Sequence, residues 1–160
     1  MYRDISVLLV EDDELIAMAA DAKLSAKHFR VLRAPDKITA LKLINEADIL
    51  ILDLNLPNGN GKDVLQIWSR KLDVGPAMVI TGCLVTDDEI PEAWSILRKP
   101  FKIDLLVDVA ERYAQVVRGM RCCKEVGILK KRMTLMWIAI AALGGIELIG
   151  PLAKFVIGLI

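Results

Sequence analysis

Residues 5–14, ISVLLVEDDE, contain the two features that decide the fold. The first six residues are β-branched or leucine apart from Ser6, and such a run is typical of a strand buried on both faces of a sheet. The run ends abruptly in four acidic side chains. The stretch that follows, through residue 29, carries apolar side chains near helical spacing at Leu15, Met18, Ala19, Ala22 and Ala26. The pattern predicts a strand followed by a helix.

This pattern of a short apolar strand and then a helix recurs four more times. The pairs are FRVLRA with ITALKLINEA, DILILDL with KDVLQIWSR, PAMVI with a short DDEIPEAW segment, and WSILRKP with IDLLVDVAERYAQVV. Parallel strands need long crossover connections, so the alternation predicts an α/β fold: a flavodoxin-like, doubly wound, five-stranded parallel sheet in the order 2-1-3-4-5. Trp68 and Trp94 are interpreted as packing residues on helices. Ligands of such a sheet bind at the carboxyl ends of its strands.

The charge distribution divides the chain into parts. Residues 1–117 hold 14 basic and 19 acidic side chains, whereas residues 118–160 hold 7 basic and 2 acidic ones. We therefore predict a folded domain over 1–117, a basic linker helix over 118–132 and a helical apolar tail over 133–160.

Three interpretations stay open for the tail. The first is a membrane anchor, with Lys130, Lys131 and Arg132 on the cytoplasmic side. The second is an interfacial or re-entrant hairpin broken at residues 144–145, because these glycines and Glu147 weaken a straight span. The third is a soluble segment that oligomerises or docks a partner.

Several function classes are disfavoured by composition. The three cysteines, Cys83, Cys122 and Cys123, form neither a disulfide framework nor a zinc motif, which favours a reducing cytosol. The N-terminal apolar run is too short for a secretory signal. Basic residues are not interleaved with aromatic ones, so we expect no nucleic-acid partner. His28, the sole histidine, is interpreted as solvated rather than as a phosphoryl donor.

Polar residues stand where the predicted strands end. Glu11, Asp12 and Asp13 follow the first strand, Asp53 ends the third, Thr81 ends the fourth and Lys99 ends the fifth. Carboxylates that converge at one crevice repel each other unless a cation neutralises them. Mg²⁺ prefers such oxygen ligands and offsets the charge of a transferred phosphoryl group. The Thr81 hydroxyl and the Lys99 ammonium are suited to contact phosphoryl oxygens.

Four motifs, LLVEDDE, LILDLNLPNGNG, VITG and LRKPF, resemble the receiver domain of two-component response regulators over about residues 4–117. The resemblance implies that Asp53 is the phosphoryl acceptor and that Glu11 and Asp12 form the acidic pair, with Asp13 as an accessory. It also implies that Asp12, Asp53, Glu11 and the backbone carbonyl of Asn55 hold Mg²⁺. Thr81 would be the switch hydroxyl, and Lys99 the phosphate-sensing lysine before a cis proline at Pro100.

Two departures from the family pattern stand out. Ile96 occupies the place, three residues before the lysine, where the family usually has a switch Tyr or Phe. The connection from Thr81 to Lys99 is also short and leaves little room for a full fourth helix. It resembles the short variant of many stand-alone receivers of alphaproteobacterial type.

The function implied is phosphorelay signal transduction, in which a histidine kinase or phosphotransfer protein transfers a phosphoryl group to Asp53. The chain would not be an enzyme beyond slow autodephosphorylation, and it would be cytoplasmic, with the tail as a potential tether to the inner membrane. Two alternatives stay open. One is a structural or membrane-tethered module that is never phosphorylated, and the other is a magnesium-dependent aspartyl phosphatase, although Asn55 stands where that enzyme needs a general acid.

Overall fold

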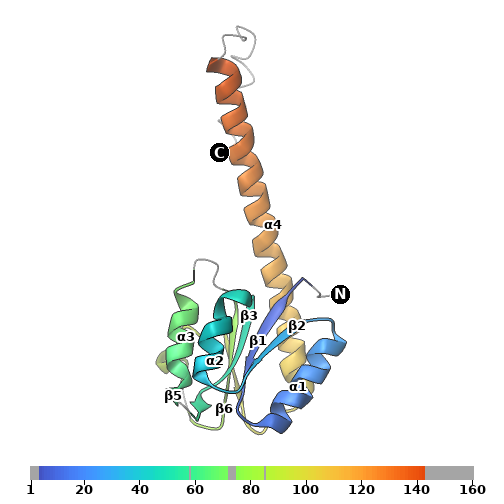
Figure 1. Ribbon diagram of the computed structural model, residues 1–160, viewed down its shortest axis with the longest axis vertical. Coiled ribbons are helices and arrows are strands. Elements are labelled where there is room, and N and C mark those ends of the chain that lie inside the picture. The colour runs from blue at the N-terminus through green and yellow to red at the C-terminus, as the bar shows by residue number, and fades with distance from the viewer. Residues whose placement is uncertain (1–3, 58, 72–74, 85, 143–160) are drawn as a thin grey trace. The chain divides into compact units, whose positions relative to one another are not determined.

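A computed structural model describes residues 4–57, 59–71, 75–84 and 86–142, with the backbone alone for residues 87, 123 and 125–142. Five parallel strands form a sheet in the order β2-β1-β3-β6-β7 (Figure 1). They are β1 (Ser6–Val10), β2 (Arg30–Ala34), β3 (Ile49–Asp53), β6 (Ala77–Thr81) and β7 (Ser95–Arg98). Since β6 and β7 are the fourth and fifth strands of this sheet, the predicted α/β fold and strand order are confirmed.

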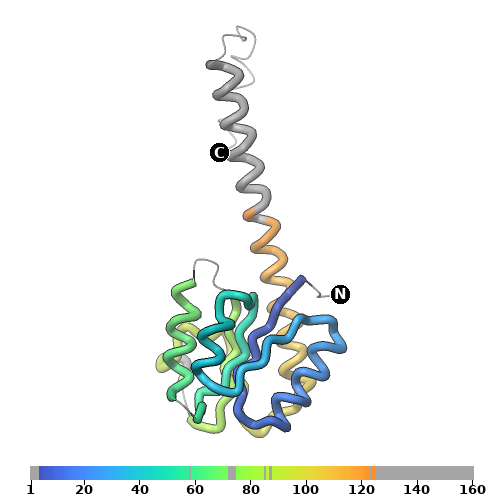
Figure 2. The backbone as a smooth tube through the Cα atoms, in the orientation of Figure 1, coloured from blue at the N-terminus to red at the C-terminus, as the bar shows by residue number. Residues whose placement is uncertain are grey.

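Helices cover both faces of the sheet, as Figures 1 and 2 show. The helices are α1 (Glu14–Ala26), α2 (Lys37–Leu43), α3 (Gly61–Ser69) and α4 (Ile103–Ala142), and a 3-10 turn, η1 (Ile44–Glu46), continues α2. Alternate residues of a strand point to opposite faces. Leu50 and Leu52 therefore pack toward α2 and α3, while Ile49 and Ile51 pack toward α1 and the first turns of α4.

The buried face of α1 differs from its most apolar stripe. Ala17, Ala20 and Leu24 are buried, whereas Leu15 and Met18 are 79% and 55% exposed. Both sets fit helical spacing, and the small alanines allow the helix to approach the sheet closely. Periodicity alone could not choose between the two stripes.

The connection between β6 and β7 is short, as predicted. In its described residues it contains a 3-10 turn, η2 (Asp87–Glu89), and no α-helix. Trp94 therefore precedes a strand and is half exposed, so its predicted place on a helix is wrong. Trp68 lies on α3 as predicted, fully buried, and its indole N–H donates to the carbonyl of Gly75 at 2.8 Å.

The chain divides into two compact units, Met1–Arg118 and Gly119–Ile160. The first contains the sheet and the helices that cover it. The second contains the later turns of α4, to Ala142. Of the predicted tail, residues 143–160 lie outside the described part. Within the described residues, we find no helix with an apolar stretch long enough to cross a membrane.

Candidate phosphoryl-acceptor site

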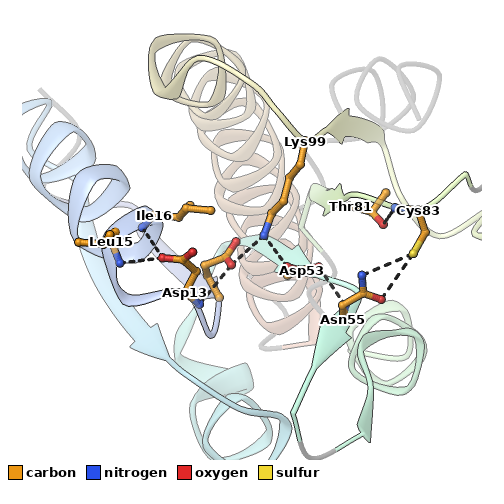
Figure 3. Close-up of polar contacts among 9 residues, drawn as sticks. Asp13, Leu15, Ile16, Asp53, Asn55, Thr81, Cys83 and Lys99 are labelled. Atoms are coloured by element: carbon orange, nitrogen blue, oxygen red, sulfur yellow. Dashed lines mark hydrogen bonds and ion pairs between the residues drawn. The ribbon is translucent and has the colours of Figure 1, made fainter.

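Four polar side chains meet at the carboxyl edge of the sheet. Asp53 is the last residue of β3, Thr81 is the last residue of β6, Glu11 directly follows β1 and Lys99 directly follows β7. Figure 3 shows Lys99 extending to Asp53, with Thr81 and Asn55 beside it. The parallel topology thus brings together residues that are up to 88 positions apart in sequence.

Three carboxylates form a cluster at this edge. Oxygens of Glu11, Asp12 and Asp53 all lie within 4.8 Å of one another. Glu11 and Asp53 are buried, whereas Asp12 is exposed. Burial raises the pKa of Glu11 and the nearby Asp53 carboxylate adds to the increase, although the hydrogen bond from Lys99 opposes it. The Glu11 Oε2 atom is buried and has no hydrogen-bond partner among the described residues.

Lys99 is the cation of the site. Its Nζ atom lies 2.6 Å from Asp53 Oδ2 and 2.8 Å from Glu11 Oε1. Partial burial disfavours the ammonium, but the two hydrogen-bonded carboxylates outweigh it and raise the pKa of Lys99. The Lys99 backbone N–H donates to the Thr81 carbonyl at 2.9 Å, and the peptide bond to Pro100 is cis, as the resemblance implied.

The Asp53 carboxylate is held in one orientation. Its Oδ2 atom accepts from Lys99, and its Oδ1 atom accepts from the Asn55 backbone N–H at 2.9 Å. Asn55 begins a small antiparallel hairpin, β4 (Asn55–Leu56) paired with β5 (Gly59–Asn60). Gly61 lets this loop close tightly, because an added Cβ there would lie 2.5 Å from the Asp53 carbonyl oxygen.

Thr81 is fully buried, and its Oγ1 atom accepts the backbone N–H of Cys83 at 3.0 Å. A hydroxyl that accepts one hydrogen bond keeps its own proton for another acceptor.

Asp13 caps α1 by accepting from the backbone N–H groups of Leu15 and Ile16. His28 is exposed, with a left-handed φ of 67°, after the end of α1.

Cys83 is a neighbour of the site that the sequence did not suggest. Its sulfur lies 3.5 Å from Asn55 Nδ2, and both residues line a groove of about 540 Å³ beside the carboxylates. Asp12 and Lys62 also line this groove. The sequence could have indicated this neighbour, because Cys83 lies two residues after Thr81 and so at the same edge of the sheet.

Residues 7–111 match the family described as response regulator receiver domain. The transcriptional regulatory protein QseB of Haemophilus influenzae is 31% identical over 118 residues, which cover 70% of this chain and 52% of QseB. The cell cycle response regulator CtrA of Brucella ovis is 30% identical over 107 residues, 63% of this chain and 46% of CtrA. The chain thus spans about half the length of these curated relatives.

The fold is also similar to that of solved receiver domains. The non-phosphorylated HemR receiver domain from Leptospira biflexa superposes with a TM-score of 0.62 at 29% identity, covering 69% of this chain and 94% of that domain. The family match spans the five strands and the first turns of α4. The chain therefore belongs to the response-regulator receiver domains of two-component signalling.

Proposed function

We propose that Asp53 accepts a phosphoryl group from a phosphohistidine of a histidine kinase or phosphotransfer protein. The observation that carries this proposal is the contact of one buried aspartate with Lys99, inside a cluster of three carboxylates at the end of β3. The family membership supports it, because receivers are signalling domains. In the transfer, the N–P bond of the donor breaks and an O–P bond to Asp53 forms. The histidine leaves as a neutral imidazole after taking up a proton.

The site is suited to Mg²⁺. Three carboxylates face one ammonium, and Glu11 Oε2 is buried without a partner among the described residues, so the cluster has both the charge and an oxygen to offer a hard cation. Glu11, Asp12, Asp53 and the backbone carbonyl of Asn55 would hold it. When bound, Mg²⁺ offsets the negative charge of the phosphoryl group during transfer.

Thr81 and Lys99 would respond to the new group on Asp53. A phosphoryl group adds a charge of roughly −1.5 to −2 and three acceptor oxygens. The Thr81 hydroxyl donates to one of these oxygens, and the Lys99 ammonium moves its ion pair from the carboxylate to another. Both atoms already lie at this edge of the sheet, and their backbones are joined by the hydrogen bond from Lys99 to Thr81.

The two alternative functions have less support. An aspartyl phosphatase needs a general acid near its nucleophile, and the residue two positions after Asp53 is Asn55. We therefore expect turnover no faster than slow hydrolysis of the protein's own acyl phosphate. In a module that is never phosphorylated, the Lys99 contacts with Asp53 and Glu11 would only neutralise two buried carboxylates, and the cluster of three carboxylates would have no function.

Intact-mass measurement tests the proposal. The full chain is incubated with acetyl phosphate, with and without Mg²⁺, beside Asp53→Asn and the control Asp108→Asn, which changes an exposed aspartate on α4. We expect one added phosphoryl group in the wild type and in the control, dependent on Mg²⁺, and none in Asp53→Asn. Equal labelling of Asp53→Asn would refute the assignment, and sustained release of phosphate from unrelated monoesters would favour the phosphatase.

We further propose that the second unit holds the receiver at an anionic membrane surface on the cytoplasmic side. The support is the excess of basic residues over 118–160 and the sequence of α4, in which KKR at 130–132 precedes MTLMWIAIAA at 133–142. Each basic residue near an anionic bilayer contributes about 1 kcal/mol, so three contribute about 100-fold in affinity.

Vesicle flotation tests the membrane proposal. The full chain should float with vesicles that contain phosphatidylglycerol, and replacing Lys130, Lys131 and Arg132 by Gln should weaken binding about 100-fold. A matched control replaces Lys42, Lys62 and Arg70 of the first unit by Gln. Failure of the wild type to bind any vesicle would contradict the membrane proposal and favour an oligomerising or partner-docking segment.

A further inference from the structure

The family pattern does not indicate how the phosphorylation state of Asp53 would affect the rest of this chain. Ile96 stands where an aromatic switch residue is usual, and it is only partly buried, packed against the core cluster on the α2 and α3 face. An isoleucine has neither the aromatic ring nor the hydroxyl of the usual switch residues. A different contact is therefore needed to carry the state of Asp53 to the rest of the molecule.

We propose that β7 transmits the phosphorylation state of Asp53 to α4 through the hydrogen bond between Ser95 and Tyr113, and that Trp94 reports it at the surface. This inference rests on the proposed function. It concerns the regulation of the same site and assigns roles to Ser95 and Tyr113, which the sequence did not single out, and a new role to Trp94.

The two ends of β7 make the contacts that the proposal requires. At one end, Lys99 follows the strand and binds Asp53 and Glu11. At the other end, Ser95 accepts a hydrogen bond of 2.7 Å from the Tyr113 hydroxyl of α4. Four strand residues at about 3.3 Å each separate these contacts by about 13 Å. The strand is thus a short, direct link between the acceptor and α4.

β7 is one of the two edge strands of this sheet and, unlike the other edge strand β2, it leads directly into Lys99. Among the described residues it pairs with β6 alone, from Ser95 opposite Met78 to Arg98 opposite Thr81. A strand held along one side moves with fewer broken ladder bonds than a central strand. Lys99 must follow the phosphoryl oxygens once Asp53 is modified, and its backbone is continuous with this edge strand.

Trp94 and Tyr113 form an aromatic pair beside this link. Their ring centroids lie 5.9 Å apart at 77°, an edge-to-face arrangement. Tyr113 is 8% exposed, so its hydroxyl has little water to replace Ser95 as a partner, whereas Trp94 is 50% exposed. The backbone N–H of Trp94 donates to the Ala77 carbonyl of β6 at 2.8 Å. A shift of β7 relative to α4 must therefore change the environment of the Trp94 ring.

The test compares the full chain with Tyr113→Phe, which deletes the hydroxyl and keeps the ring, and with Tyr2→Phe, which changes the other tyrosine. Each protein is treated with Mg²⁺ and acetyl phosphate, and phosphoryl uptake is measured by intact mass. Hydrogen exchange is followed in the peptide that covers 103–118. Tryptophan emission is recorded, with Trp94→Phe as the reference that isolates the Trp94 signal.

We expect uptake to alter both Trp94 emission and exchange in 103–118 in the wild type and in Tyr2→Phe. Tyr113→Phe should take up phosphoryl to the same extent yet lose at least half of both responses. Ser95→Ala removes the acceptor of the Tyr113 hydrogen bond at a partly buried position and should lose the same share of both responses. It replaces Tyr113→Phe in the test if that variant does not fold.

Two results would overturn the inference alone: a phosphorylated wild type without either response, or full responses in phosphorylated Tyr113→Phe and Ser95→Ala. The contact would then only pack α4 onto the sheet. Absence of phosphoryl uptake in the wild type would refute the proposed function, and this inference with it.

Discussion

At the scale of single residues, the burial of the Glu11 carboxyl group disfavours its ionised form. Its carboxyl group is buried beside Asp53, one oxygen accepts from Lys99, and the other has no partner among the described residues. The raised pKa of Glu11 means that the fold favours its protonated form. The stability linked to this group is present below the ordinary carboxyl pKa and is lost as the pH rises through the folded value.

We therefore predict that Glu11→Gln is more stable than the wild type at neutral pH without Mg²⁺, by about 1 kcal/mol, because the variant has no buried charge at position 11. The difference in Tm should shrink as the pH falls and Glu11 of the wild type becomes protonated. Thermal unfolding of both proteins between about pH 4 and 7 measures this. A variant that is less stable at pH 7 would show that Lys99 compensates Glu11 fully.

The grouping of four polar side chains at one sheet edge could be predicted from sequence, because each of them directly ends or follows a strand and parallel topology brings strand ends together. Glu11, Asp53, Thr81 and Lys99 meet as expected. Cys83 and Tyr113 could not be found in this way. Cys83 contacts Asn55 through the conformation of a loop, and Tyr113 reaches Ser95 from a helix turn whose orientation periodicity does not fix.

At the scale of elements, the strands were the most predictable parts. β1, β3 and β6 are buried along their whole length, β2 and β7 are only partly buried, and all five lie where the sequence places them. Helix faces were harder, since α1 offers two stripes and buries the one with alanines. Trp94 was misplaced because the short connection before β7 holds only a 3-10 turn among its described residues.

Gly75, two residues before β6, packs closely against the backbone of Asp48. An added Cβ would lie 1.8 Å from the carbonyl oxygen of Asp48, which is backbone and cannot move aside. We predict that Gly75→Ala lowers the free energy of unfolding by about 2–3 kcal/mol. Urea denaturation measures this, with Gly82→Ala as the control, because its Cβ would meet nothing within 4 Å and should cost less than about 0.5 kcal/mol. Equal losses in the two variants would contradict the role given to Gly75.

At the scale of the whole molecule, the chain joins an acidic receiver to a basic, apolar segment. The change of charge near residue 118 was visible in the sequence, and the compact units divide after Arg118. The receiver could be predicted because two independent patterns agree: apolar strands alternate with helices, and polar residues stand where the strands end. The tail has only its apolar composition, so the sequence could not decide among the three interpretations of it.

Binding of Mg²⁺ should increase the stability of the fold. Because Mg²⁺ would bind the cluster only when the strands bring Glu11, Asp12 and Asp53 together, we predict that it raises the Tm of the wild type. At 100 times the dissociation constant, the stabilisation is about 2.7 kcal/mol. Asp12→Asn should lose most of this effect, while Asp108→Asn keeps it. An unchanged Tm of the wild type in millimolar Mg²⁺ would argue against the site.

The location of the phosphoryl group is the most direct test that Asp53 is the acceptor. After treatment with acetyl phosphate and Mg²⁺, borohydride reduces an aspartyl phosphate to homoserine, and peptide sequencing by mass spectrometry shows where that residue lies. We predict homoserine at position 53 alone, and none without the phosphodonor. Homoserine at position 12 or 13, or phosphate on a histidine or serine with position 53 unmodified, would contradict it.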